Sequence, residues 1–175
     1  MTLDELPQPQ PVNAMKAEVH RLAEQFAEKA GFLPGDSIES LVERLGGFVH
    51  YIGAHDSFFE NDGSLQVWGP GNFEIRISGL TGVERDRFTI AHEIGHYVLH
   101  SRGGKKPIRA ARCGSDRVEW EANWFASALL MPAADFRRTC EMYANNLSRV
   151  AARYLVSPKA AEIRMKALNI IRNDD

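Results

Sequence analysis

The segment that most constrains this chain is FTIAHEIGHYV, residues 88–98, in which a glutamate follows the first of two histidines spaced four residues apart. On an α-helix, His92 and His96 lie about 6 Å apart along the axis and about 40° apart around it, so both imidazoles can reach one zinc ion. Glu93 lies on the neighbouring sector, close enough to take a proton from a water bound to that ion. The segment therefore predicts a helix with two zinc ligands, His92 and His96, and a general base, Glu93.

The surroundings of this motif favour a metal site over two histidines in an ordinary core. On a helical wheel the apolar residues of the segment fill one broad arc, and His92, Glu93, His96 and His100 share the arc beside it. Packing alone gives no reason to place a glutamate between two histidines, because burying an unpaired charge is costly. A helix with an apolar back and one ionisable flank is what a metal site requires.

A catalytic zinc site needs a third protein ligand. His100 lies about 12 Å along the helix from His92, too far for both to bind one ion, so we expect it beside the ligands or facing the cleft. The next helix offers Glu119 and Glu121, which point about 200° apart, so only one of them can face the site. Glu119 shares its stripe with small residues that permit close helix packing and is the preferred ligand. Glu121 is the alternative, and the glutamate that is not a ligand is expected on the surface.

The whole chain predicts a single domain of the α+β class. Prolines at positions 7, 9 and 11 exclude a helix and predict an extended, solvated arm over residues 1–12. The domain then spans residues 13–171, with a tail at 172–175. Apolar periodicity predicts helices at residues 13–29, 38–45, 82–102, 116–131, 133–143, 147–154 and 158–171, and strands at 48–54, 64–68 and 73–78. We expect a hairpin of the last two strands, in a small antiparallel sheet packed with several helices, and a basic loop at 103–114.

Several helix starts carry a capping signal. The expected N-caps are Asn13, Ser37 and either Ser115 or Asp116, and Thr81 with Glu84 forms a capping-box pattern.

Composition excludes several classes of protein. Lys and Arg total 21 against 23 Asp and Glu, so no global field draws the chain toward nucleic acid or an anionic membrane. No window approaches the roughly 18 apolar residues of a membrane span, and the acidic start is unlike a signal peptide. The two cysteines, Cys113 and Cys140, are too few for a disulfide framework and are expected to be thiols. These features predict a cytoplasmic protein.

Three strings carry a resemblance to a known family. They are RFTIAHEIGHYVLH at residues 87–100, EWEANWFASALLMP at 119–132, and the Val156–Ser157 step in LVSPKAAEIRMKAL. Together they resemble the ImmA/IrrE family of bacterial metallopeptidases. The resemblance implies a compact zincin-like metallopeptidase domain, in which His92, His96 and a glutamate of EWEAN bind zinc and Glu93 is the general base. Glu119 also matches the glutamate of the ExxAD string in gluzincin-type peptidases, with Asn123 in place of the aspartate.

The same resemblance implies a protein substrate, because members of this family cleave helix-turn-helix repressors. The strand that carries Phe73, Ile75 and Ile77 precedes the metal helix, and we expect it to be an edge strand to which an extended substrate segment adds. The reaction also needs a donor for the oxyanion, and the ligands need supporting hydrogen bonds. The candidates for these two roles are Tyr97, His100, Asn123, Tyr143 and Tyr154.

Two alternatives to a peptidase remain open. Residues 147–154 and 158–171 resemble a helix-turn-helix in spacing, and residues 145–175 hold six Lys or Arg against three acidic residues, so this region could contact DNA. The thin positive charge makes direct DNA binding an unfavoured expectation, and several apolar residues look interior, namely Ala151, Leu155, Ala160, Ile163 and Leu168. The other alternative keeps the zinc but binds or sequesters a regulator without efficient cleavage.

Overall fold

The helices and strands arise largely where apolar periodicity places them. The computed structural model describes residues 6–53, 64–79, 81–111 and 116–172. The helices in these residues are α1 (Lys16–Ala30), α2 (Ile38–Arg44), α3 (Val83–Gly95), α4 (Arg117–Leu130), α5 (Ala133–Met142), α6 (Leu147–Tyr154) and α7 (Pro158–Ala167), and a π-helical turn, η2 (His96–His100), continues α3. The strands are β1 (Phe48–Ile52), β2 (Ser64–Gly69), β3 (Asn72–Ser78) and β4 (Ile108–Ala111). The predicted α+β class is confirmed.

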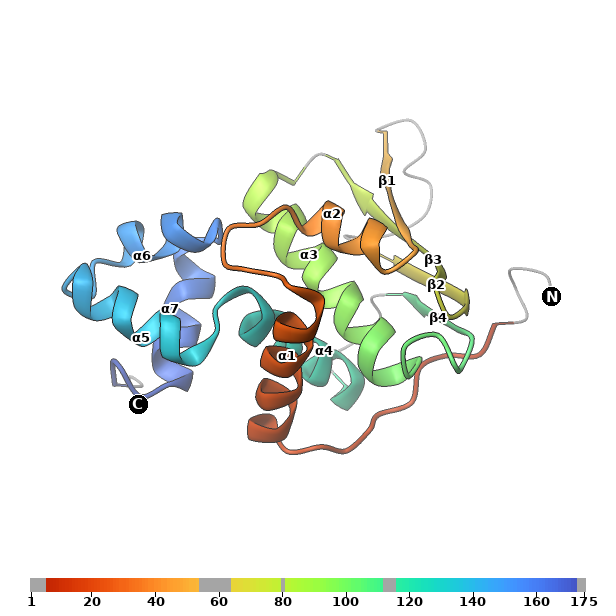
Figure 1. Ribbon diagram of the computed structural model, residues 1–175, viewed down its shortest axis with the longest axis horizontal. Helices are drawn as coiled ribbons and strands as arrows, with labels where there is room; N and C mark the ends of the chain where they lie inside the picture. The colour runs from red at the N-terminus through yellow and green to blue at the C-terminus, as the bar shows by residue number, and fades with distance from the viewer. Residues whose placement is uncertain (1–5, 54–63, 80, 112–115, 173–175) are drawn as a thin grey trace.

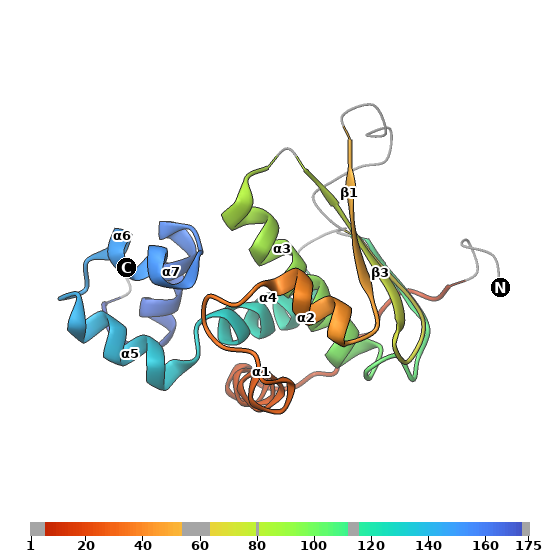
Figure 2. The same ribbon diagram turned by 45° about the horizontal axis from the view of Figure 1, so that its top comes forward.

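Helix α3 lies at the centre of the molecule, between the sheet and α4 (Figures 1 and 2). The sheet and α2 pack on one side of α3, and α4 packs on the other side, with α1 against α4. Helices α5, α6 and α7 form a group beyond the end of α4. Because α3 and α4 carry the candidate site residues, the site lies between the two central helices.

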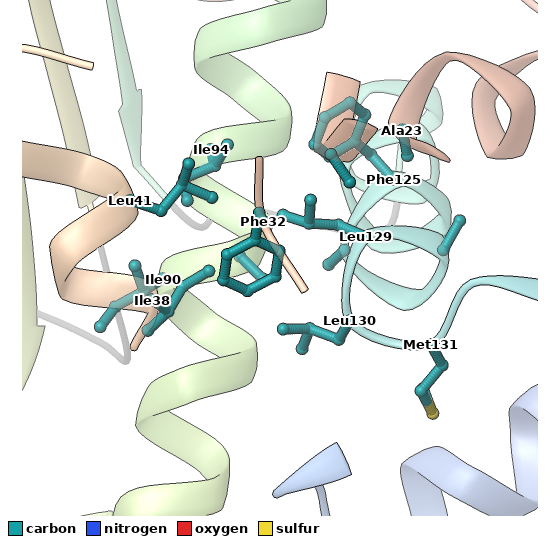
Figure 3. Close-up of a cluster of buried hydrophobic side chains, with 14 of the residues drawn as sticks. Ala23, Phe32, Ile38, Leu41, Ile90, Ile94, Phe125, Leu129, Leu130 and Met131 are labelled. Carbon is teal, nitrogen blue, oxygen red and sulfur yellow. The ribbon is translucent and has the colours of Figure 1, made fainter. Parts of the chain in front are cut away.

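Aliphatic and aromatic side chains fill the core between these layers (Figure 3). Ile90 and Ile94 on α3, Leu41 on α2 and Phe125 on α4 are all 0% exposed. Burying one such side chain contributes about 1.5–3 kcal/mol, so these apolar faces hold α3 and α4 together. The polar flanks of the two helices are then left to face each other.

The sheet has the strand order β1-β3-β2-β4 among the described residues. Strands β2 and β3 form the predicted antiparallel hairpin, and Gly71 in its turn has a φ of 64°, which a glycine adopts without strain. Strand β1, however, pairs in parallel with β3, with Val49 opposite Ile75. The expectation of an antiparallel sheet is wrong at this pair. The sheet is mixed because β3, which is heavily buried, lies inside the sheet. It pairs with β2 in antiparallel orientation on one side and with β1 in parallel orientation on the other.

Strand β3 is therefore not an edge strand. Both of its sides are paired, by β1 and by β2, and Phe73, Ile75 and Ile77 are at most 1% exposed. The prediction that a substrate segment adds to this strand is wrong, because no open backbone edge is left there. The sequence also fails to predict β4, since four residues are too few for a periodicity to show and its pairing with β2 defines it.

The segment before α1, residues 6–15, is called the N-terminal arm below. It is extended, as the prolines predict, and most of its residues are exposed, but it makes specific contacts: Leu6 is 8% exposed, and the carbonyl of Pro7 accepts a hydrogen bond from the N–H of Arg109 at 2.9 Å. The N–H of Val12 donates to the carboxylate of Glu121 at 2.9 Å. Figure 1 shows the arm running from the side of β4 to the start of α1. The arm is thus extended and largely exposed over these residues, but proline spacing does not specify the contacts that it makes with β4 and α4.

Most predicted helix ends agree with the structure. The side chains of Ser37 and Asp116 accept hydrogen bonds from the N–H groups of Ser40 and Glu119 at 3.1 and 3.2 Å, and so cap α2 and α4. Helix α4 ends at Leu130, just before Met131–Pro132.

Three helix ends differ from the prediction. Asn13 does not cap α1, which begins at Lys16 because the Met15 N–H donates to the Glu18 carboxylate at 2.7 Å. The Thr81 hydroxyl donates to Asp86 and is not the cap of α3, which begins after Gly82. Helix α7 ends at Ala167, four residues earlier than expected.

Helices α5–α7 bury fewer apolar residues than the sequence indicates. Ala151 is buried, as expected, but Leu155 and Ile163 are 45% and 52% exposed. Cys140 is a buried free thiol, as expected, while Cys113 lies outside the described residues. None of the helices in the described part of the chain combines the length and hydrophobicity that a membrane span needs.

Candidate metal centre

Three side chains, one each from α3, η2 and α4, converge on one point. Nε2 of His92 lies 3.0 Å from Nε2 of His96. Oε2 of Glu119 lies 3.2 Å from Nε2 of His92, and Oε1 of Glu119 lies 3.3 Å from Nε2 of His96. All three side chains are buried, and they form a group that could hold a metal ion. The structure thus brings together the histidines and the preferred third residue of the sequence analysis.

The spacing of these atoms fits a tetrahedral zinc ion. Ligand bonds of about 2.0–2.1 Å at tetrahedral angles separate the ligand atoms by about 3.3–3.4 Å, close to the separations seen here. Nδ1 of each histidine faces a neighbour, Asn123 for His92 and His100 for His96. When each histidine is neutral and carries its proton on Nδ1, each Nε2 has a lone pair. These two lone pairs and those of the Glu119 carboxylate then point at one another. A bound cation removes the repulsion among three such acceptors.

The local sequence explains why α3 and α4 come close enough to form this group. A Cβ on Gly95 would lie 3.1 Å from both Cα and O of Ala122, so only a glycine allows this approach without displacement. Asp116 caps α4 and places Glu119 in its first turn. The glycine of HEIGH and the alanine of EWEAN therefore set the distance between the histidines and Glu119.

Glu93 lies beside His92 on α3 and is 1% exposed. It is separate from the three-residue group, whose ligand atoms come from His92, His96 and Glu119. The structure thus places Glu93 next to one of the donor residues but not among the donors.

Asn123 supports the first histidine. Its Oδ1 lies 2.9 Å from Nδ1 of His92, and an amide oxygen accepts a proton from that nitrogen. The proton on Nδ1 leaves the lone pair of Nε2 for a metal ion. Among the residues considered for a supporting role, Asn123 therefore occupies the position that orients His92.

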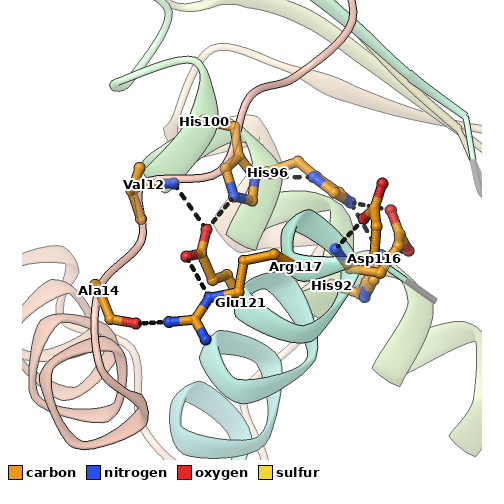
Figure 4. A network of polar contacts seen from close by, with 9 residues as sticks. Val12, Ala14, His92, His96, His100, Asp116, Arg117 and Glu121 are labelled. Atoms are coloured by element: carbon orange, nitrogen blue, oxygen red, sulfur yellow. Dashed lines mark hydrogen bonds and ion pairs between the residues drawn. The ribbon is translucent and has the colours of Figure 1, made fainter.

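His100 and Glu121 lie behind the second histidine (Figure 4). Nδ1 of His100 is 3.0 Å from Nδ1 of His96, and Nε2 of His100 is 3.0 Å from Oε2 of Glu121. Glu121 is 0% exposed, so the expectation that the second glutamate lies on the surface is wrong. It does point away from the three donor atoms, as the helical spacing requires, but His100 and the N-terminal arm cover that side of α4.

Burial and charge set the protonation of these groups. Burial raises the pKa of Glu119, but the imidazoles of His92 and His96 outweigh this and hold it well below its usual range. Burial lowers the pKa of His96 to about 4, although Glu119 opposes the shift. A neutral imidazole and an ionised carboxylate are the forms that bind a metal ion.

Sequence comparison shows the family of this chain. Residues 55–166 match a family model described as the IrrE N-terminal-like domain. The chain belongs to the ImmA/IrrE family of metallopeptidases. Two relatives are Metallopeptidase ImmA of Bacillus subtilis (strain 168), 38% identical over 50 residues, and Radiation response metalloprotease IrrE of Deinococcus deserti, 33% identical over 137 residues. The matches cover 28% and 74% of this chain, and 30% and 44% of the two relatives.

A solved structure shows the same fold. A Mycobacterium tuberculosis transcriptional regulator superposes with a TM-score of 0.61 at 16% sequence identity, over 85% of this chain and 46% of that one. The ImmA/IrrE-family chain thus spans less than half of the length of each of these three proteins.

The tyrosines considered as oxyanion donors lie away from the metal centre of this family member. The Tyr97 hydroxyl accepts from the Gly71 N–H at 3.1 Å, and its ring stacks on Phe73. The Tyr154 hydroxyl lies 2.8 Å from both Asp135 and Thr139, among the C-terminal helices. Tyr143 ends α5 in the same group. The expectation that Tyr97 or Tyr154 serves the site is wrong, because both hydroxyls are engaged elsewhere.

A cleft of about 600 Å³ opens next to the metal centre. Its walls come from α1, α3, α4 and α7, and Asn123, which contacts His92, lines it. Its lining includes Phe88 and Thr89 of α3 but neither Glu93 nor any of the three donor residues, so the cleft borders the centre through Asn123. The sequence analysis did not find this cleft. The exposed apolar side chains of Trp120 and Ile163 line it, but their positions on two helices distant in sequence give no local signal.

Proposed function

We propose that this chain is a zinc-dependent endopeptidase of the gluzincin type. The observation that carries the proposal is the convergence of His92, His96 and Glu119 at 3.0–3.3 Å, with Glu93 next to His92 on α3. Two histidines of one helix and a glutamate of the next are a gluzincin ligand set, and membership of a metallopeptidase family supports this chemistry.

Different residues of the chain would have different roles in peptide hydrolysis. When bound by His92, His96 and Glu119, a zinc ion supplies a Lewis acid that polarises the scissile carbonyl and lowers the pKa of a water molecule. The Glu93 carboxylate takes a proton from the attacking water and carries it to the nitrogen of the leaving amine. Asn123 holds the His92 ring in the required tautomer, and the buried surroundings of the site keep other water out.

A protein substrate suits the cleft. Its volume of about 600 Å³ admits several side chains, and exposed apolar residues of α4 and α7 line it. The family resemblance suggests a helix-turn-helix repressor as the substrate, which this chain would meet in the cytoplasm. Residues of α7 line the cleft, so part of the helix that could otherwise read DNA faces the cleft, and this supports a role in substrate binding over DNA binding.

The Glu93→Gln variant tests the proposed mechanism. The amide is isosteric, so the variant should keep its fold and its zinc, while cleavage falls by about 10²- to 10⁴-fold. The assay incubates the protein with a helix-turn-helix repressor encoded beside it and looks for discrete fragments that disappear with a chelator. Cleavage at the wild-type rate would refute the role of Glu93. Zinc-loaded wild type that binds the repressor without cutting it would instead support the sequestering alternative.

Metal analysis tests the ligand set independently of any substrate. The wild type should hold about one zinc ion per chain, and His92→Ala, His96→Ala or Glu119→Ala should lose it because two protein ligands are too few for a stable site. Glu141→Ala, at an exposed position on α5, is the matched control and should keep its zinc. Full zinc content in the double variant His92→Ala/His96→Ala would overturn the assignment.

A further inference from the structure

A chain of hydrogen bonds leads from the metal centre to the N-terminal arm (Figure 4). It begins at Nδ1 of His96, passes through both ring nitrogens of His100, and ends at Oε2 of Glu121, with a separation of 3.0 Å at each step. The Val12 N–H donates to the same oxygen at 2.9 Å, and Nε of Arg117 donates to Oε1 at 3.1 Å. The three central side chains are at most 4% exposed, so water does not compete for these contacts.

With His100 neutral, the hydrogens in this chain have one consistent arrangement. The Glu121 carboxylate can only accept, so Nε2 of His100 carries a proton and donates it to Oε2. Nδ1 of a neutral His100 then has a lone pair, which accepts from Nδ1–H of His96. Nε2 of His96 is left with its lone pair directed at His92 and Glu119. The carboxylate at the far end thereby selects the tautomer of His96 that binds a metal ion.

The N-terminal arm fixes the carboxylate in turn. One oxygen of Glu121 accepts from the backbone of Val12, and Arg117, which holds the other oxygen, also donates to the carbonyl of Ala14. The carbonyl of Pro7 is bonded to Arg109 of β4, so the arm is anchored at both of its ends. Prolines between these anchors restrict the backbone and reduce the entropy lost on docking.

We propose that His100 and Glu121 are positioning residues for His96, and that docking of the N-terminal arm completes this support. The inference rests on the proposed function only through the role of His96 as a metal ligand. His100 and Glu121 act through His96, and neither contacts the substrate. The arm, which the sequence places outside the domain, is then part of the metal centre.

Two substitutions at one position separate positioning from simple packing. In His100→Asn, the amide oxygen can take the place of Nδ1 and accept from His96, but the side chain is too short to reach Glu121. In His100→Gln, the amide nitrogen can take the place of Nε2 and donate to Glu121, but no acceptor is left for His96. The measurements are zinc affinity by competition with a chromophoric chelator, the visible absorption of the Co²⁺-substituted protein, and the thermal stability of the metal-free protein.

If His100 positions His96, the two variants should rank in opposite orders for zinc affinity and for the stability of the metal-free protein. His100→Gln should lose about 10- to 100-fold in zinc affinity, the usual cost of removing a supporting contact, and its Co²⁺ spectrum should change. His100→Asn should retain more of the affinity and a spectrum closer to wild type, although it is the less stable variant without metal. Affinity that follows metal-free stability, with His100→Asn weaker than His100→Gln, would overturn the positioning role.

A proline substitution tests the arm. Val12→Pro removes the one N–H that donates to Glu121, and residue 11 is already a proline, so the extended backbone tolerates the change. We expect a several-fold loss of zinc affinity. The matched control is Gln10→Pro, at an exposed position of the same arm, which should bind zinc as the wild type does. Equal affinity of the two proline variants would overturn the contribution of the arm.

These outcomes differ from a failure of the proposed function. If His96→Ala keeps its zinc, the ligand set is wrong. If His96→Ala loses its zinc while both His100 variants bind zinc as tightly as wild type, the ligand set stands and the positioning role of His100 is wrong.

Discussion

Oδ1 of Asn123 lies 2.9 Å from Nδ1 of His92, one turn of α4 beyond Glu119. One face of α4 therefore supplies both the candidate third ligand and the acceptor that orients the first histidine. In the related gluzincin-type string an aspartate stands where this chain has Asn123. A neutral amide accepts a weaker hydrogen bond than a carboxylate, so the residue at this position tunes the basicity of His92.

The effect of substituting Asn123 on zinc affinity should depend on whether the new side chain can accept a hydrogen bond from His92. Asn123→Asp keeps the acceptor and adds a negative charge near the ion, so zinc should bind at least as tightly as in wild type. Asn123→Leu removes the acceptor at similar volume, and zinc affinity should fall by about 10- to 100-fold. Competition with a chromophoric chelator measures both. Equal affinity of Asn123→Leu and wild type would show that this contact does not support His92.

Gly95 should tolerate no larger side chain without cost to the metal centre. Its Cβ position lies 3.1 Å from the backbone of Ala122 and 3.3 Å from Cβ of Phe125, so Gly95→Ala must push α4 away by a few tenths of an ångström. Alanine favours the helix by about 1 kcal/mol, which offsets part of the strain. We therefore expect a small change in thermal stability but a clear loss of zinc affinity, because Glu119 moves with α4. Undiminished zinc affinity would show that α4 adjusts without moving Glu119.

The sequence predicts the three donor residues because each of them belongs to a short motif within one helix. Two histidines and a glutamate within one helix, and a glutamate followed by small residues in the next, define positions on two helix faces whatever the remainder of the chain does. The prediction that Glu119 and Glu121 point apart is confirmed in the structure by their different partners. The burial of Glu121 could not be predicted, because it depends on an arm more than 100 residues away in sequence.

Strand position is likewise a non-local property. The hairpin of β2 and β3 follows from its turn, which the sequence shows. The place of β3 inside the sheet depends on pairing with β1, across a connection whose path no local pattern specifies. A buried inner strand and a half-buried edge strand share the same alternating apolar residues over so short a length.

The cleft between α3, α4 and α7 should govern substrate affinity. Ile163 is 52% exposed on the wall formed by α7, so Ile163→Asp places a charge in an apolar cleft with little effect on the fold. We expect a rise in KM for cleavage of the proposed repressor substrate with kcat nearly unchanged, because Ile163 lies away from Glu93 and the candidate zinc ligands. The control is Met142→Asp, at a 75% exposed position on α5 outside the cleft. Equal KM values for the two variants would place substrate binding elsewhere.

A buried cation makes the stability of the fold depend on the protonation of His20. Nη1 of Arg164 lies 3.2 Å from Nδ1 of His20, and Arg164 is 0% exposed. Arg164 also donates to the carbonyl of Met131 at 3.0 Å and pairs with Glu24, so it ties α7 to α1 and to the end of α4. Protonated His20 would place a second cation against this buried guanidinium, with Lys16 nearby on α1.

The sign of the resulting pH dependence follows from the direction of the shift. Burial, Arg164 and Lys16 lower the pKa of His20 from 6.5 to about 4. The unfolded chain therefore takes up this proton first as the pH falls, and stability is lost between about pH 6.5 and about pH 4. The full shift corresponds to about 3 kcal/mol, and solvent screening of a partly exposed imidazole reduces the expected loss to about 1–2 kcal/mol.

The variant His20→Gln isolates this contribution, because its amide can accept from Arg164 and does not titrate. Urea unfolding of metal-free protein at about pH 7.5 and about pH 4.5 should show a smaller loss of stability for His20→Gln than for wild type, by about 1–2 kcal/mol. Metal-free protein is required because protonation of the zinc ligands would otherwise add its own loss. His50→Gln, at an exposed position on β1, is the control and should follow the wild type. Parallel pH curves for wild type and His20→Gln would mean that His20 takes up its proton as readily in the folded protein as in the unfolded chain. At about pH 4.5 Arg164 would then be held by Glu24 and the Met131 carbonyl without an acceptor at His20.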